Sequence, residues 1–174
     1  MIKIVKNILI IIFICSPSFL NASEKIAYID LQLIMNQSNV GISIRKEINK
    51  LNSDLKKEIL DLETGLKKKD KELMAKKNIL EKKEFDLLVS KLRIDIKKFN
   101  DLKKKKILDI KNKKIAYDIK LVNSIKPILT NFSKSNNISL LFQKKNIILG
   151  AVELDITKDI LAIVNKDIKT LDLK

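Results

Sequence analysis

Histidine and cysteine, the residues most often used for metal binding and nucleophilic catalysis, are almost absent from this chain. It contains no His, and its one Cys, Cys15, lies near the N-terminus. A His-based catalytic triad is therefore excluded, and so is a zinc site built from Cys or His. Acidic residues stand mostly at helical spacings from lysines, as Glu63 does from Lys67, which is typical of a solvated charged face. We expect no enzyme activity, no catalytic residue and no bound metal.

Glycine gives no sign of a nucleotide site either. The three glycines, Gly41, Gly65 and Gly150, are isolated from one another. A phosphate-binding loop needs several closely spaced glycines, whose backbone amides surround the phosphates. We therefore expect no cofactor, and a protein that acts by binding alone.

The remaining feature of the sequence that could support a binding function is its positive charge. The chain carries a net charge of +15, and the stretch Lys56–Lys114 holds 21 basic residues against 11 acidic ones. Its densest runs are Lys67–Lys69 and Lys103–Lys106. Such a surface attracts anionic lipid, lipopolysaccharide, nucleic acid or acidic polypeptides. Only two residues, Arg45 and Arg93, are arginines, and bidentate recognition of phosphate needs arginine, so nucleic acid is the disfavoured partner.

These lysines belong to a stretch whose pattern predicts one long helical hairpin over residues 44–132. Neither glycine nor proline occurs between Gly65 and Pro127. Apolar residues recur at steps of three and four, which is typical of a helix that packs along another helix. The first seam comprises Ile44, Ile48, Leu51, Leu55, Ile59, Leu62, Leu66, Leu73 and Leu80, and is interrupted by Lys69 and Lys76. The second comprises Leu88, Leu92, Phe99, Leu102, Ile107, Ile110, Tyr117 and Leu121.

The change of register between the two seams falls in residues 75–84. A single continuous rod would be roughly 130 Å long at about 1.5 Å per residue. A reversal in this segment instead lets the two seams face each other. We therefore place the tip of an antiparallel arm near residues 75–84.

The N-terminus has the pattern of an export signal. Lys3 and Lys6 precede a short apolar core, and Asn21-Ala22-Ser23 offers a cleavage zone. Cleavage after Ala22 removes residues 1–22 and the only cysteine. The predicted location of the mature chain is the periplasm.

Strands are predicted at both ends of the mature chain. The first is Glu24–Leu31, followed by a helical turn over Gln32–Asn36 and a break at Ser38, Asn39 and Gly41, with Asn39 or Ser43 as helix cap. After the arm, Pro127 should kink the returning helix, which should finish near residues 133–137. Strands Ile138–Phe142 and Ile147–Val152 should then form a hairpin through the turn Gln143–Asn146. The last helix should begin with Thr157 as N-cap and present one apolar face, comprising Ile160, Leu161 and Val164.

These strands and one short helix are too few for an independent core. The predicted body, residues 23–43 and 133–174, therefore needs copies of itself. The fold expected from the residues is α+β, mostly α, with a small β-rich oligomerisation body and one projecting coiled-coil arm per subunit.

The two ends of the chain resemble the Skp (OmpH-type) periplasmic chaperones. The segment KIAYIDLQLIMNQSNVG resembles the opening strand, turn and break of that family, through Gln32, Ser38 and Gly41. The segment ISLLFQKKNIILGAVELDITKDILAIV resembles its closing part, through Asp155, Ile156 and Thr157. The middle matches in length and character only, and Asn136-Asn137 stands where the family often has Gly-Tyr.

The resemblance implies a homotrimer shaped like a jellyfish, with a β-rich body and three helical arms. It implies an ATP-independent holdase that binds unfolded outer-membrane β-barrel proteins in the cavity between the arms and prevents their aggregation. The candidate contacts with clients or anionic surfaces are distributed along the arm: Lys67, Lys68, Lys69, Met74, Ile79, Leu80, Lys103, Lys104, Lys105 and Lys106. The alternative is a basic coiled-coil protein that binds anionic phospholipid or lipopolysaccharide without chaperone activity.

Overall fold

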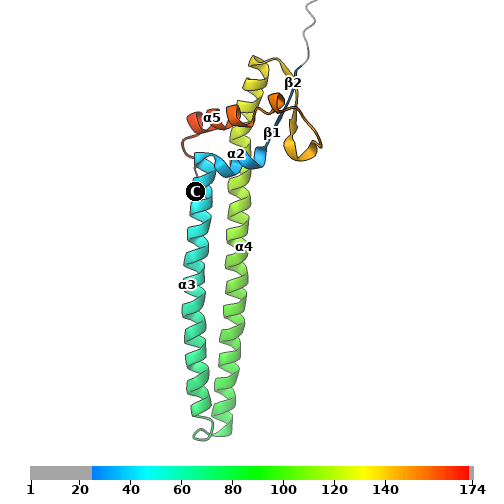
Figure 1. Ribbon diagram of the computed structural model, residues 1–174. Coiled ribbons are helices and arrows are strands. Elements are labelled where there is room, and N and C mark those ends of the chain that lie inside the picture. The colour runs from blue at the N-terminus through cyan, green and yellow to red at the C-terminus, as the bar shows by residue number, and fades with distance from the viewer. Residues whose placement is uncertain (1–24, 173–174) are drawn as a thin grey trace, which may run out of the picture.

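The computed structural model describes residues 25–172 as a long helical hairpin that projects from a small α/β body (Figure 1). The order is β1 (Lys25–Ile29), α2 (Leu31–Gln37), α3 (Asn39–Ala75), α4 (Lys82–Ser135), β2 (Ile138–Gln143), the 3-10 turns η1 (Lys144–Asn146) and η2 (Val152–Leu154), and α5 (Thr157–Asp167). The predicted fold class, mostly helical with a small sheet, is confirmed. The predicted export signal, its cleavage site and Glu24 lie outside the described residues.

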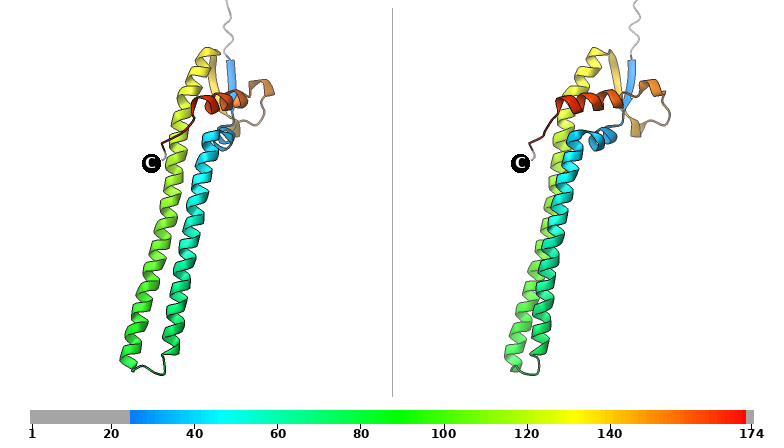
Figure 2. Two further views of the ribbon diagram at one scale, coloured as in Figure 1. Left: turned by 90° about the vertical axis from the view of Figure 1, so that its left-hand side faces the viewer. Right: turned by 60° about the vertical axis from the view of Figure 1, so that its left-hand side comes forward.

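The arm consists of α3 and the part of α4 that lies beside it, and the C-terminal part of α4 continues past the start of α3 alongside the body (Figures 1 and 2). The chain reverses between Ala75 and Lys82, where backbone bonds from Ile79 N and Leu80 N to Lys76 O close the turn at 3.0 and 3.1 Å. α4 continues through Pro127 to Ser135 without interruption. It ends where Asn137 takes a positive φ of 54°, a conformation that Asn tolerates better than most residues.

The start of α3 is fixed by Ser38, not by Asn39 or Ser43 as the sequence suggested. Ser38 is fully buried, and its Oγ accepts a hydrogen bond from Gly41 N at 3.2 Å, as an N-cap does. Gly41 lies inside the helix instead of breaking it. A Cβ at Gly41 would lie 1.7 Å from Met35 O, so only glycine lets α2 and α3 meet this closely.

The sheet is smaller than predicted. β1 pairs in parallel with β2, from Lys25 opposite Ile138 to Ile29 opposite Gln143. Two parallel strands need a crossover connection, and here the crossover is the entire arm. The predicted strand Ile147–Val152 is wrong: the residues after η1 form an irregular loop, and this segment makes no ladder within the described chain.

The main core lies at the junction of body and arm. It joins β1, α2, α5 and the body-proximal halves of α3 and α4, through Ile29, Ile34, Val40, Ile44, Ile48, Tyr117, Leu121, Ile125, Ile160 and Val164. The short elements of the body thus obtain their core by packing on the base of the arm. Ile160, Leu161 and Val164 do pack here, as predicted for the last helix. Thr157 is its first residue and Ile156 its N-cap, so the predicted cap is wrong by one position.

Candidate functional site

The lysine run Lys103–Lys106 divides between two faces of α4. Lys103 Nζ lies 3.3 Å from Glu63 Oε1, and Lys106 Nζ lies 2.7 Å from Glu58 Oε2, both across the seam on α3. Lys104 and Lys105 are exposed, and no carboxylate of residues 25–172 lies within 4.0 Å of either. Consecutive helical residues point about 100° apart. Half of this run therefore stabilises the arm, and half remains available to a partner.

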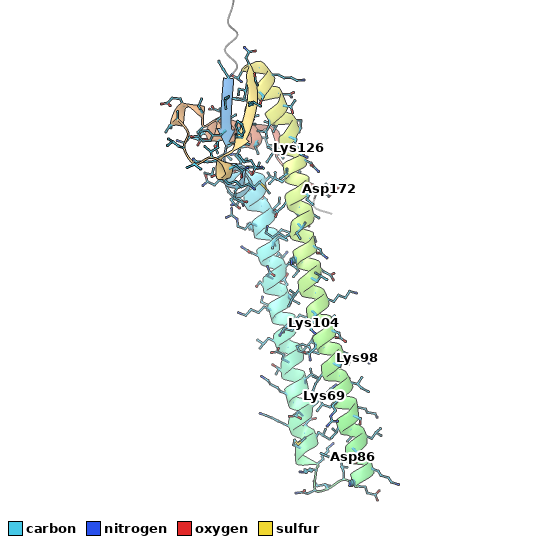
Figure 3. The ribbon with its side chains drawn as sticks, turned by 90° about the vertical axis from the view of Figure 1, so that its right-hand side faces the viewer. Lys69, Asp86, Lys98, Lys104, Lys126 and Asp172 are labelled. Carbon is cyan, nitrogen blue, oxygen red and sulfur yellow. The ribbon has the colours of Figure 1, made fainter. Side chains whose placement is uncertain are left out.

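The run Lys67–Lys69 divides in the same way. Lys69 Nζ contacts Asp95 Oδ2 on α4 at 2.7 Å, which explains how a lysine is tolerated in the seam. The hydrogen bond and the charge of Lys69 hold the pKa of Asp95 below its usual range. Lys68 lies 4.0 Å from Glu72 on its own helix, and Lys67 is exposed. Figure 3 marks Lys69, Lys98 and Lys104 along the arm.

The three apolar candidates belong to the end of α3 and the turn that follows it, and this turn is the end of the arm far from the body (Figure 2). Ile79 has 80% of its surface exposed and Met74 50%, whereas Leu80 is half-buried. Four exposed lysines flank them, two on each side of the turn: Lys76, Lys77, Lys82 and Lys83. The tip therefore combines exposed apolar area with positive charge.

An apolar stripe on the outside of α4 is a surface that the sequence analysis missed. Its residues repeat at multiples of seven, and each has about half of its surface exposed: Leu87, Ile94, Leu108 and Ile115. The stripe spans about 42 Å at 1.5 Å per residue. Lysines follow at the fourth position after Leu87 and Ile94, as Lys91 and Lys98, and Lys105 continues that row. We call Leu87, Ile94, Leu108 and Ile115 the α4 stripe.

The stripe lies on a different face of α4 from the seam. Leu92 and Tyr117 are buried, as predicted for the second seam. Ile107, placed in that seam by the sequence, is instead 52% exposed, and its neighbour Lys106 makes the contact with α3. A second seven-residue repeat, offset from the seam, was the sequence signal that could have revealed the stripe.

Two shallow grooves interrupt the seam on either side of the Lys69–Asp95 pair. The groove toward the tip measures about 290 Å³ and is lined by Leu73, Leu88 and Leu92 among others. The other measures about 280 Å³ and is lined by Leu62, Phe99 and Leu102 among others. Phe99 thus lies beside the helix–helix seam. The grooves follow from the polar step at Lys69, which keeps apolar packing from being continuous.

The body carries a second apolar surface. The loop after η1 exposes Ile148 and Leu149 almost completely, and Val152 beside them is 79% exposed. On β2, Leu140 and Phe142 are also exposed. Exposed apolar residues that cluster in this way mark an interaction surface. We call Leu140, Phe142, Ile148, Leu149 and Val152 the body patch.

Residues 25–172 contain no group of three or more His, Cys, Asp or Glu side chains that could hold a metal ion. In that part of the chain no helix has the length and apolarity needed to cross a membrane.

The model of one protein family, outer membrane protein (OmpH-like), matches residues 25–164. The chain belongs to the OmpH-like family. The match runs from the first residue of β1 to Val164 of α5, so it includes the body, the arm and the junction core. A search of curated proteins finds no match.

Among solved structures, the fold is similar to that of an OmpH-like protein from Caulobacter crescentus, which is described as a candidate outer membrane chaperone. The TM-score is 0.80 at 16% sequence identity, and the match covers 85% of this chain and 88% of that one. At this identity the likeness concerns the fold.

Proposed function

We propose that this OmpH-like chain is a periplasmic holdase chaperone that binds unfolded outer-membrane β-barrel proteins without ATP. In this proposal residues 1–22 are an export leader, residues 23–43 and 133–174 form the body, and residues 44–132 form the arm. The observation that carries the proposal is the α4 stripe with its flanking lysines. Family membership supports a chaperone role in general, and the stripe supplies a surface for it.

The chemistry of the stripe suits an unfolded barrel chain. Such a chain exposes apolar side chains at every second residue of its future strands and usually carries a negative net charge. Each stripe residue can bury part of its exposed half against the client, which contributes about 1 kcal/mol. Lys98, Lys104 and Lys105 add attraction over about 10 Å at moderate salt. Many weak contacts of this kind hold a chain without selecting one sequence.

The row of lysines beside the stripe also disfavours pairing between two arms. If the stripe were the seam of a coiled coil, Lys91, Lys98 and Lys105 would occupy the second core position of each heptad. Lysine at a core position destabilises such a pairing, and like charges on the two arms would repel. The stripe therefore favours binding of an acidic chain and disfavours pairing with the stripe of another copy.

The proposed assembly is a homotrimer joined through the body patch. Burying Ile148, Leu149 and Val152 between copies would remove the most exposed apolar side chains of the body from water. The arms would then project from one body and surround a common space. This arrangement lets one client contact several stripes at once, which raises the overall affinity above that of a single arm.

The test compares variants of residues 23–174 as holdases. An unfolded outer-membrane barrel protein is diluted from urea, and aggregation is followed by light scattering without nucleotide. Ile94→Ser with Leu108→Ser removes the middle of the stripe and should weaken client binding about thirtyfold, because about 1 kcal/mol is lost at each of the two positions. The matched control is Ile42→Ser with Leu60→Ser, two exposed residues of α3. Equal protection by the two double variants would contradict the assignment of the stripe.

The tip of the arm supports a second candidate function, binding to an anionic membrane surface. Ile79 projects from a hydrogen-bonded turn between Lys76, Lys77, Lys82 and Lys83, a combination that suits the surface of an anionic membrane or lipopolysaccharide. Ile79→Asn should then reduce sedimentation with phosphatidylglycerol vesicles and leave aggregation suppression unchanged. If it reduces suppression instead, the tip is a client contact. Binding to neutral vesicles at the same level would contradict the role of the lysines.

A further inference from the structure

The loop that carries most of the body patch is held by an ion pair between its two flanks, Lys144 and Asp155, and by Tyr28 of β1. Residues 147–152, from the end of η1 to the first residue of η2, contain no charged side chain. They expose Ile148, Leu149 and Val152 to solvent. A loop with this composition would ordinarily fold its apolar side chains inward to bury them. Here contacts on both sides of the loop prevent that.

The first contact closes the loop at its base. Lys144 Nζ, in η1, lies 2.9 Å from Asp155 Oδ2, at the far end of the loop, and the Asp155 side chain is only 18% exposed. Asp155 is itself fixed, because its Oδ1 accepts a hydrogen bond from Thr157 N at 3.0 Å and another from the Thr157 hydroxyl. Partial burial disfavours its charged form, but these bonds and Lys144 hold the pKa of Asp155 below its usual range.

The second contact lies in the middle of the loop. The hydroxyl of Tyr28, in β1, donates a hydrogen bond to Ala151 O at 3.1 Å. The Tyr28 ring lies against Gly150, where a Cβ would come within 3.0 Å of ring atom Cε1. Lys144 Nζ lies 5.8 Å from the centre of the same ring, so the two contacts adjoin each other.

β1 fixes the base of this arrangement. Asp30 N donates to Thr157 Oγ1 at 2.8 Å, and Ile156 N donates to Tyr28 O at 3.0 Å. The strand that begins the described chain thus holds both the loop and the start of α5. We call Tyr28, Lys144 and Asp155 the loop clasp.

We infer that the loop clasp positions residues 147–152 as a preformed docking segment for a second copy of this chain. The inference rests on the proposed self-association and adds the residues that prepare it. A loop already held in its bound pose loses little conformational freedom on association, so the clasp strengthens association without touching the partner. Tyr28, Lys144 and Asp155 are positioning residues in this account.

Charge identifies a second copy as the occupant. Without Lys3 and Lys6, residues 23–174 keep a net charge of +13 (+15 − 2), so two copies repel each other over most of their surfaces. At the loop two copies can come into contact without bringing like charges together, since residues 147–152 are neutral and apolar. Leu140 and Phe142 of β2 extend this neutral surface on the sheet. An acidic client, by contrast, would gain nothing electrostatic from contact here.

The test measures association and loop mobility in the same variants of residues 23–174. Tyr28→Phe with Lys144→Gln opens both contacts and leaves Ile148, Leu149 and the backbone unchanged. The oligomer mass is followed by sedimentation velocity over a dilution series, and hydrogen exchange is measured at the amides of Ile147, Leu154 and Asp155. These amides make the backbone bonds that define the loop, to Lys144 O, Ala151 O and Val152 O.

The clasp variant should need about tenfold higher concentration to assemble, equivalent to about 1.4 kcal/mol, and its loop amides should exchange faster. Lys144→Arg, which keeps the ion pair with Asp155, should assemble as the parent does. Lys145→Gln is the control for charge, because Lys145 is exposed and forms no ion pair within the described residues.

Ile148→Ser with Leu149→Ser distinguishes a failure of the proposed interface from a failure of the clasp inference. If this variant keeps the parent mass, the body patch is not the interface and the proposed assembly fails. If it dissociates but the clasp variant assembles at the parent concentration, the patch is the interface and the clasp inference is wrong. Faster exchange without weaker assembly would also contradict the inference.

Discussion

Leu121→Ala should destabilise the whole molecule, because Leu121 belongs to the core that joins body and arm. Its side chain is 1% exposed, and the cluster around it includes Ile34 of α2, Ile44 of α3 and Ile160 of α5. A fully buried Leu→Ala substitution costs about 3–5 kcal/mol. A groove of about 230 Å³ lies beside Leu121, so neighbouring side chains have room to shift and fill the cavity that the substitution leaves. We therefore expect the lower end, about 3 kcal/mol.

For a chain of this size that loss corresponds to a melting temperature about 6–12 °C lower. The assay is thermal unfolding followed by circular dichroism at 222 nm, with all variants at one protein concentration, because association shifts apparent stability. Leu60→Ala is the control, since Leu60 is 61% exposed on α3 and should change stability by less than about 0.5 kcal/mol. If the two substitutions lower the melting temperature equally, body and arm do not share the core described here.

The two classes of lysine and the clasp carboxylate give further predictions. Lys104→Gln with Lys105→Gln should weaken client protection several-fold and reduce its salt dependence while leaving the melting temperature unchanged. Lys103→Gln with Lys106→Gln should leave client protection unchanged and lower the stability of the arm by about 0.5–1 kcal/mol. If both double variants change light scattering and melting temperature equally, the division of the lysines into two classes is wrong. Because the pKa of Asp155 is lowered in the folded chain, its stabilisation is complete at neutral pH and is lost as pH falls below the usual carboxyl range of about 4. Asp155→Asn should therefore be less stable at pH 7 and show a smaller loss on acidification, in parallel melts at pH 7 and pH 3; an unchanged pH dependence would contradict this.

The long helices were predictable because periodicity is local information. Seam residues such as Ile44, Leu92 and Tyr117 recur at helical spacing, and the absence of glycine and proline from most of the arm favours an unbroken helix. The register change in AKKNILEKKE lies where the chain reverses between Ala75 and Lys82. Opposing seams make a hairpin the arrangement that buries both.

The details that failed depend on tertiary contacts. Residues 147–152 have the composition of a strand, yet they form a loop in which Tyr28 binds Ala151 O and Lys144 pairs with Asp155 across the base. Ser38, not Asn39 or Ser43, caps α3, because its Oγ accepts the hydrogen bond from Gly41 N at the point where α2 and α3 pack closely. Nothing within a single window of sequence specifies such a contact.

The candidate site was predictable in composition and not in geometry. The lysine runs were evident, but only the structure separates Lys104 and Lys105 from Lys103 and Lys106, which bond to Glu63 and Glu58. The α4 stripe was overlooked because an exposed apolar repeat and a buried one look alike in sequence. Their difference lies in which face the partner helix covers.

The most direct test of the central claim is the mass of a complex between residues 23–174 and an unfolded outer-membrane barrel protein. The two are mixed on dilution from urea without nucleotide, and the soluble species are weighed by light scattering after size-exclusion chromatography. The account predicts one soluble species containing a chain trimer and one client, which separates into its components when Ile94 and Leu108 are replaced by Ser. A chain that elutes at its own mass while the client aggregates would contradict the claim.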